Sequence, residues 1–421
     1  MRTFNAVLLA ASLLATEGKL VSADWGEWRG PGRTGHVPLG EAIPTNLPTE
    51  ASFAWHLKIG DGFSSPVVAG GRVFYMDNQD GYEALHAVEA ATGHELWRTN
   101  IDKTFKDTQT VPGPRCTPVA DGDRIYAQSC RGELHCRKAA DGSLLWKTSF
   151  SGDFGAVFIG ETGSAQGAMR HGNDGSPLVD GQTLYVQVGS TNGAGLVAFD
   201  KLTGKVLWKS QNDVAGYASP FLASLAGTRQ LLSFTADGLL SVAPSDGRFL
   251  WRVPMKTSFS RHVMTPIVRD DYVVISSHEV GLEGIKVATA NGEWTAEKAW
   301  LKKETAINFA CPVEEAGYIY GVGPTKDLVC VELKTGQRQW AQTGYVAGSA
   351  ANAYAGFIVM GKNILALTDG GQIVLFAADP QAFHELGTLQ VCGKNWCNPA
   401  YANGHLYFRD AHELFSLKLI P

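Results

Sequence analysis

Chemically versatile side chains recur just ahead of a repeated dipeptide in which a small residue precedes proline. The dipeptides are Ser65-Pro66, Thr117-Pro118, Ser176-Pro177, Ser219-Pro220, Thr265-Pro266, Cys311-Pro312 and Asn398-Pro399. The side chains before them form the candidate ligand-binding set: Arg115, Arg170, His171, Asp174, Tyr217, Arg261, His262, Asn308 and Trp396. Where they converge, three arginines and two histidines make a positive focus for a small anion, a carboxylate or an acidic peptide.

Two other interpretations of these side chains remain open. His171 and His262 could share a metal ion or act as an acid and a base. Arginine and histidine in such loops can also do no more than satisfy backbone carbonyls and neighbouring acids. The chain contains no G-x-S-x-G, H-E-x-x-H, phosphate-binding or dinucleotide-binding motif and no metal-ligand cysteine spacing. We therefore assign no catalytic residue and no metal site.

A second repeat indicates the elements that position these loops. In five hairpins a turn glycine lies four residues before a tryptophan, and the glycines are Gly93, Gly142, Gly204, Gly247 and Gly336. Glycine supplies the positive φ that such turns need, and a tryptophan at a fixed register can dock against the neighbouring repeat. The predicted docking series is Trp55, Trp97, Trp146, Trp208, Trp251, Trp300 and Trp340.

The spacing of the prolines predicts the fold. Successive prolines lie 43 to 59 residues apart, with one gap of 87 residues that holds a repeat without its proline at 355–378. A period near that of a four-stranded blade predicts an all-β, eight-bladed β-propeller over residues 51–421. The last repeat ends before its outer strand, and the strand around Trp55 supplies the missing piece. The N- and C-terminal strands then share one blade and close the ring, and the candidate loops gather at one mouth of the channel.

The N-terminus and the composition indicate where the protein works. Residues 1–23 have the basic start, short apolar stretch and small-residue cleavage site of a signal peptide, so we expect cleavage near Ala23. We expect residues 24–50 to form a strap over the outside of the domain. No other apolar run approaches membrane-spanning length, and a net charge of -5 disfavours nucleic acid as a partner. The mature chain is predicted to be a periplasmic or secreted monomer.

The phrase A-x-D-x-x-T-G-x-x-x-W at 198–208 resembles the pyrroloquinoline-quinone (PQQ) repeat. This repeat occurs in the eight-bladed quinoprotein dehydrogenases and in the propeller lipoprotein of the outer-membrane β-barrel assembly machine. The dehydrogenase resemblance implies PQQ held between a tryptophan and a disulfide of adjacent cysteines, with Ca²⁺ on carboxylate and amide oxygens. None of the seven cysteines is adjacent to another, and Asn173-Asp174 is more typical of a turn than of a Ca²⁺ site. The assembly-machine resemblance implies a non-catalytic scaffold, although the chain lacks that family's lipid-anchor cysteine.

Three functions follow from these observations. The leading hypothesis is an exported, non-catalytic binding or scaffold protein of the cell envelope, without a cofactor, whose partners are envelope proteins or a small anionic ligand. The first alternative is a PQQ- and Ca²⁺-dependent alcohol or sugar dehydrogenase with a reduced site. The second is a carbohydrate-binding or carbohydrate-cleaving propeller, for which Tyr217 and Trp396 would be the aromatic platforms.

Overall fold

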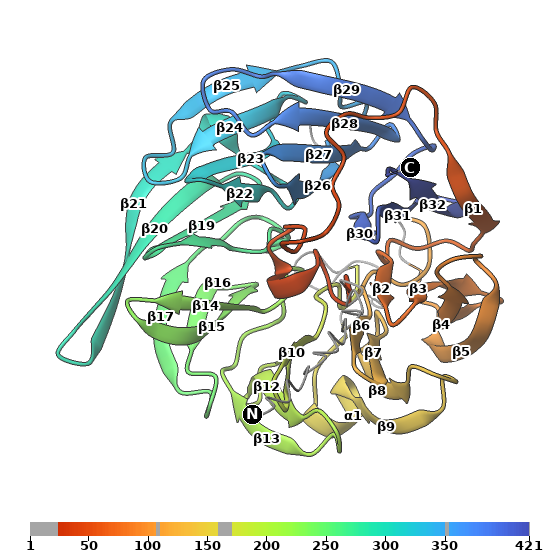
Figure 1. Cartoon of the computed structure of the whole chain (residues 1–421). Coiled ribbons are helices and arrows are strands. Elements are labelled where there is room, and N and C mark those ends of the chain that lie inside the picture. Colours follow the sequence, from red (N-terminus) through yellow and green to blue (C-terminus); the bar gives the residue numbers. More distant parts are fainter. Residues whose placement is uncertain (1–23, 107–109, 159–170, 350–352, 421) are drawn as a thin grey trace, which may run out of the picture.

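The chain folds into a ring of eight β-sheets, as the computed structural model shows (Figure 1). The structure describes residues 24–106, 110–158, 171–349 and 353–420, so the predicted signal peptide lies outside the described residues. Within these ranges, 32 strands form eight four-stranded antiparallel sheets. The predicted eight-bladed propeller is therefore confirmed. None of the helices in this part of the chain has the length and apolar character needed to cross a membrane.

Each blade runs from an innermost strand at the channel to an outer strand at the rim. Blade 1 contains β2 (Val67–Ala69), β3 (Arg72–Gln79), β4 (Tyr82–Glu89) and β5 (Glu95–Lys103), and blade 2 contains β6 (Val119–Asp121), β7 (Arg124–Gln128), β8 (Glu133–Lys138) and β9 (Leu144–Ser149). Blade 3 contains β10 (Leu178–Asp180), β11 (Thr183–Ser190), β12 (Ala194–Asp200) and β13 (Val206–Ser210), and blade 4 contains β14 (Phe221–Leu225), β15 (Thr228–Thr235), β16 (Gly238–Val242) and β17 (Phe249–Pro254).

The second half of the ring repeats this order. Blade 5 contains β18 (Ile267–Arg269), β19 (Tyr272–Ser277), β20 (Gly281–Ala290) and β21 (Glu293–Lys302), and blade 6 contains β22 (Val313–Glu315), β23 (Tyr318–Val322), β24 (Leu328–Glu332) and β25 (Arg338–Gln342). Blade 7 contains β26 (Ala355–Met360), β27 (Asn363–Thr368), β28 (Gln372–Ala377) and β29 (Glu385–Gln390). Blade 8 combines β30 (Ala400–Ala402), β31 (His405–Arg409) and β32 (Glu413–Lys418) with β1 (Phe53–Lys58). One short helix, α1 (Phe150–Phe154), follows blade 2, and a 3-10 turn, η3 (Lys303–Thr305), follows blade 5.

The ring closes between the two ends of the chain. β1 pairs antiparallel with β32, with Trp55 opposite Ser416 and His56 opposite Phe415. The indole N–H of Trp55 then donates to the carbonyl of Ala90 in blade 1 at 2.9 Å. The predicted closure by one shared blade is confirmed, and β32 has a partner along its outer edge.

The small residue of each opening dipeptide has a defined task. The backbone N–H of Ser65 donates to Thr117 Oγ1, that of Thr117 to Ser176 Oγ, and that of Ser176 to Ser219 Oγ, at 2.9–3.1 Å. The N–H of Asn398 donates to Ser65 Oγ at 3.0 Å and connects blade 8 to blade 1. Blades 8, 1, 2, 3 and 4 are thus linked in succession at the start of their innermost strands, which begin directly after the prolines.

Five tryptophans lie on the turn glycine of the next blade, namely Trp55, Trp97, Trp146, Trp208 and Trp300. The indole of Trp97 donates to Ala139 O at 3.1 Å, and the indole of Trp146 donates to Lys201 O at 3.0 Å. A Cβ on Gly204, at φ +72°, would lie 2.7 Å from the Trp146 ring. Trp208 and Trp340 donate in the same way to Pro244 O and Asp379 O. Glycine is therefore required by both the turn and the neighbouring indole.

Trp251 differs from the other tryptophans because blade 5 has no Thr-Gly turn to receive it. Its indole donates to Gln230 Oε1 of its own blade at 2.7 Å. The long β20–β21 hairpin projects beyond the ring (Figure 1), and Trp294 from β21 packs against the same core cluster as Trp251. Trp300 keeps the usual arrangement, since its ring lies beside Gly336 of blade 6.

Residues 24–37 lie in the channel (Figure 1). The expectation that residues 24–50 form a strap over the outside of the domain is therefore wrong for this part of the segment. Trp25 forms a β-bridge with Val68, and η1 (Pro31–Arg33) follows at the centre of the ring. The guanidinium of Arg33 donates to the carbonyls of Ser176, Pro177 and Pro220. Further hydrogen bonds of this segment reach blades 2, 5, 6 and 7, at Ala120 N, Thr265 Oγ1, Pro312 O and Val359 O. Blade 8 is reached beyond residue 37, where the Tyr401 hydroxyl donates to the carbonyl of Ala42. We call residues 24–37 the plug, because its backbone and side chains form hydrogen bonds with blades 1 to 7.

Candidate functional site

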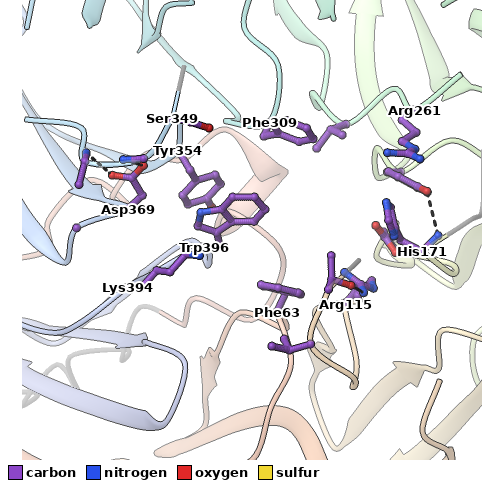
Figure 2. A pocket seen from close by; sticks show the side chains of 18 of the residues that line it. Phe63, Arg115, His171, Arg261, Phe309, Ser349, Tyr354, Asp369, Lys394 and Trp396 are labelled. Atoms are coloured by element: carbon purple, nitrogen blue, oxygen red, sulfur yellow. Dashed lines mark hydrogen bonds between the residues drawn. The ribbon is translucent and has the colours of Figure 1, made fainter. Parts of the chain in front are cut away.

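A cavity of about 1020 Å³ opens at the mouth where the loops enter the innermost strands (Figure 2). Every blade contributes at least one residue to its lining. In blade order these include Phe63, Arg115, His171, Tyr217, Arg261, Phe309, Tyr354 and Trp396. Six of the nine predicted residues line it, namely Arg115, His171, Asp174, Tyr217, Arg261 and Trp396. The loops ahead of the proline dipeptides therefore converge as their place in the repeat requires.

The other three candidates lie elsewhere. Arg170 falls outside the described residues. His262 is fully buried, with its ring stacked on Phe234 at 4.3 Å between centroids and its Nδ1 3.0 Å from Ser277 Oγ. Burial lowers the pKa of His262 to about 4, so its ring is neutral and serves packing. Asn308 is not part of the lining, whereas its neighbour Phe309 is.

The polar side of the cavity is built by blades 2 to 5. The hydroxyl of Tyr217 accepts a hydrogen bond from the backbone N–H of His171 at 3.1 Å, which ties the loop of blade 3 to that of blade 4 (Figure 2). Burial raises the pKa of Tyr217 well above its usual value, so the phenol stays neutral. The Arg115 guanidinium lies over the Phe63 ring at 5.1 Å, and Arg261 lies over Phe259 at 4.5 Å. Both arginines are thus held in place by aromatic rings.

The opposite side is aromatic. The ring centroid of Trp396 lies 6.0 Å from that of Phe309, 6.4 Å from that of Tyr354 and 5.9 Å from that of Phe63 (Figure 2). Trp28 of the plug also lines the cavity, and its indole donates to Thr265 Oγ1 at 3.2 Å. The sequence reasoning missed Phe63, Phe309, Tyr354 and Trp28. Phe63 and Phe309 lie just ahead of Ser65-Pro66 and Cys311-Pro312, so their position relative to the dipeptides would have found them. The repeat that contains Tyr354 lacks this dipeptide and gave no such signal.

Asp369 organises the cavity wall at blade 7. Its Oδ1 accepts from the backbone N–H of Ala347 at 2.7 Å, and its Oδ2 accepts from that of Gly348 at 2.8 Å (Figure 2). Both carboxylate oxygens are therefore used to hold the loop that follows β25. The second carboxylate among the lining residues is that of Asp174.

The residues of the cavity do not fit the PQQ and Ca²⁺ of the dehydrogenases. All seven cysteines are described and free, and none has an adjacent cysteine with which to form the disulfide that this cofactor packs against. Over the described ranges, no group of three or more His, Cys, Asp or Glu side chains is placed to share a metal ion. Tyr217 is only 7% exposed, so it offers no free face as a sugar platform. The arrangement provides cationic and aromatic contacts, which are means of binding.

Comparison with known families now places the chain. The family model described as outer membrane protein assembly factor BamB, of the PQQ_2 type, matches residues 38–129 and 81–342. The chain belongs to this family. The BamB of Shewanella oneidensis is 20% identical over 346 residues, which cover 77% of this chain and 79% of the relative. The BamB of Burkholderia pseudomallei is 24% identical over 301 residues, covering 62% of this chain and 72% of the relative.

Solved structures share the fold of this BamB-family chain. The BamB of Moraxella catarrhalis matches with a TM-score of 0.56 at 15% identity, over 90% of this chain and 98% of that chain. A quinohemoprotein alcohol dehydrogenase of Pseudomonas putida matches with a TM-score of 0.62 at 12% identity, over 94% of this chain and 80% of that one. Both likenesses concern the fold alone.

Proposed function

We propose that this BamB-family propeller is a non-catalytic scaffold of the cell envelope that binds protein partners during the assembly of outer-membrane proteins. The observation that carries the proposal is the family match across residues 38–342, since relatives of similar length are named outer membrane protein assembly factors. The signal peptide that the sequence predicts in residues 1–23 supports an envelope location.

The cavity supports a binding role for the mouth face. Its lining combines arginines held by aromatic rings with an aromatic cluster, and these side chains recur at protein-binding surfaces. The loops of all eight blades surround it, so one partner segment would contact residues that are far apart in the sequence. The partners we propose are therefore envelope proteins that meet the face carrying Arg115, His171 and Arg261.

Removal of the gene from its native host tests this function. We expect lower amounts of folded outer-membrane β-barrel proteins, measured by their heat-dependent mobility on gels, and restoration by the wild-type gene. Unchanged levels of every folded β-barrel protein would contradict the proposal.

A second assay separates the scaffold from a dehydrogenase. Purified protein is titrated with PQQ and Ca²⁺ by calorimetry and then assayed for dye-linked oxidation of alcohols and sugars. We expect neither saturable binding nor dye reduction, because the lining lacks the adjacent-cysteine disulfide and a metal-ligand group. Saturable Ca²⁺-dependent PQQ binding with turnover would establish an oxidoreductase instead.

A further inference from the structure

We propose that the cavity is a receptor site for an acidic peptide segment that carries an aromatic side chain, with carboxylates on the Arg261 side and the aromatic ring on the Trp396 side. The inference rests on the proposed scaffold function and specifies the chemistry of the partner. Its support comes from the state of Arg261, from the aromatic cluster and from the closed end of the cavity.

Arg261 lacks the anion that a half-buried guanidinium normally has. Its Nε is buried and has no hydrogen-bond partner, and no carboxylate of the described residues forms an ion pair with it. The Phe259 ring under its Cζ keeps it in place without neutralising its charge. Because a carboxylate forms a strong, charge-assisted hydrogen bond with a guanidinium, and because Arg261 lines the cavity, a ligand carboxylate is the partner that fits it best.

The aromatic side supplies the second contact. Trp396 is only half-buried although Phe63, Phe309 and Tyr354 surround it, so part of its ring is left to the cavity. The Nζ of Lys394 lies 5.8 Å from the centre of the same ring and brings a further positive charge to that edge. Figure 2 shows Trp396 and Arg261 on opposite sides of the cavity. A ligand that satisfies both therefore needs an aromatic group and, at some distance from it, a carboxylate.

The size and the closed end of the cavity favour a short peptide segment over a chain that threads the ring. A volume of about 1020 Å³ is at the upper end of the range for small-molecule pockets. Trp28 of the plug contributes to the lining, and the plug residues Arg29 and Arg33 are buried in the channel. A segment that enters the mouth must therefore also leave through it, as a chain end or a tight loop does.

Calorimetric titration of the purified mature protein with defined peptides tests the proposal. The probe is a terminally blocked heptapeptide with one phenylalanine between two glutamates. Two matched peptides replace phenylalanine by alanine or both glutamates by glutamine, and phenylsuccinate represents a free aromatic carboxylate. We expect binding of the probe that weakens as salt rises, with at least a tenfold loss for each matched peptide.

Protein variants assign the binding to this site. We expect Arg261→Gln and Trp396→Leu each to lower the affinity for the probe at least tenfold, with little change in the melting temperature of the protein. Arg338→Gln, on the exposed outer strand β25, is the matched control and should bind like the wild type. Binding that both cavity variants leave unchanged would overturn the proposal, and so would the absence of binding. If phenylsuccinate binds as tightly as the peptide, the site is one for a free aromatic carboxylate, and the proposal of a peptide ligand is overturned.

The two proposals fail separately. If deletion of the gene lowers folded β-barrel proteins but the peptide does not bind, the scaffold function stands and the peptide site is wrong. If the peptide binds but deletion leaves those proteins unchanged, the site stands and its role in assembly is wrong.

Discussion

The substitution Arg33→Met in the plug should destabilise the whole propeller. The Arg33 side chain is completely buried and donates to the carbonyls of Ser176 and Pro220 at 3.1 and 3.0 Å, and to that of Pro177. Its Nε also forms an ion pair with Glu27 at 3.0 Å. Methionine has a similar length but removes the donor of three carbonyls and of the Glu27 Oε2 oxygen. Loss of one partner from a buried ionic network costs about 3–5 kcal/mol, which is a large part of a typical stability of about 5–15 kcal/mol.

Urea unfolding of residues 24–421, followed by tryptophan fluorescence, measures this effect. We expect a lower midpoint with an unchanged slope, because the substitution alters stability and not the surface exposed on unfolding. The control Arg338→Met removes an exposed arginine and should stay within about 0.5 kcal/mol of the wild type. Glu27→Gln combined with Arg33→Met should cost less than the sum of the single changes, since the pair is coupled. An Arg33→Met protein within about 1 kcal/mol of the wild type would refute the reasoning.

Three further predictions concern closure, burial and the turns. Deletion of residues 51–60 removes β1 and exposes the edge of β32, so the protein should unfold or oligomerise in size-exclusion chromatography with light scattering; a monomer that melts cooperatively would contradict this. Burial raises the pKa of Glu83 to about 7. The contribution of this carboxyl group to the stability of the fold is therefore complete below about pH 4.5 and is lost as the pH rises through 7. Glu83→Gln should therefore match the wild type near pH 4 and exceed it by up to about 3 kcal/mol at pH 8 in urea unfolding, and an equal difference at both pH values would contradict the argument. Gly204→Ala should destabilise by about 2 kcal/mol more than Gly181→Ala, because both glycines have positive φ but only Gly204 abuts an indole; equal melting temperatures of the two variants would exclude that contact as the cause.

The periodic part of the structure could be predicted from the sequence. The turn glycines and tryptophans recur at a fixed distance, so blade number and register followed from their spacing, and Trp55 identified the strand that completes blade 8. The convergence of Arg115 and Arg261 followed in the same way, because both precede an innermost strand.

The parts without a period could not be predicted. The plug has no hydrophobic repeat, and the place of Arg33 depends on carbonyls that are more than a hundred residues away in the chain. Arg261 and His262 are adjacent, yet one lines the cavity and the other stacks on the buried ring of Phe234. Sequence spacing alone does not tell which neighbour in an irregular loop points inward.

The pairing of β1 with β32 also has a consequence for the timing of folding. β1 is synthesised among the first strands, but its partner, residues 413–418, is made some 350 residues later. Contacts of such high sequence separation are slow to form, because a long loop must close before they contribute. A partly made chain therefore carries an unpaired strand and an unfinished blade, both open to wrong pairing, until its last segment arrives. Completion of blade 8 is thus a late step that requires residues 413–418.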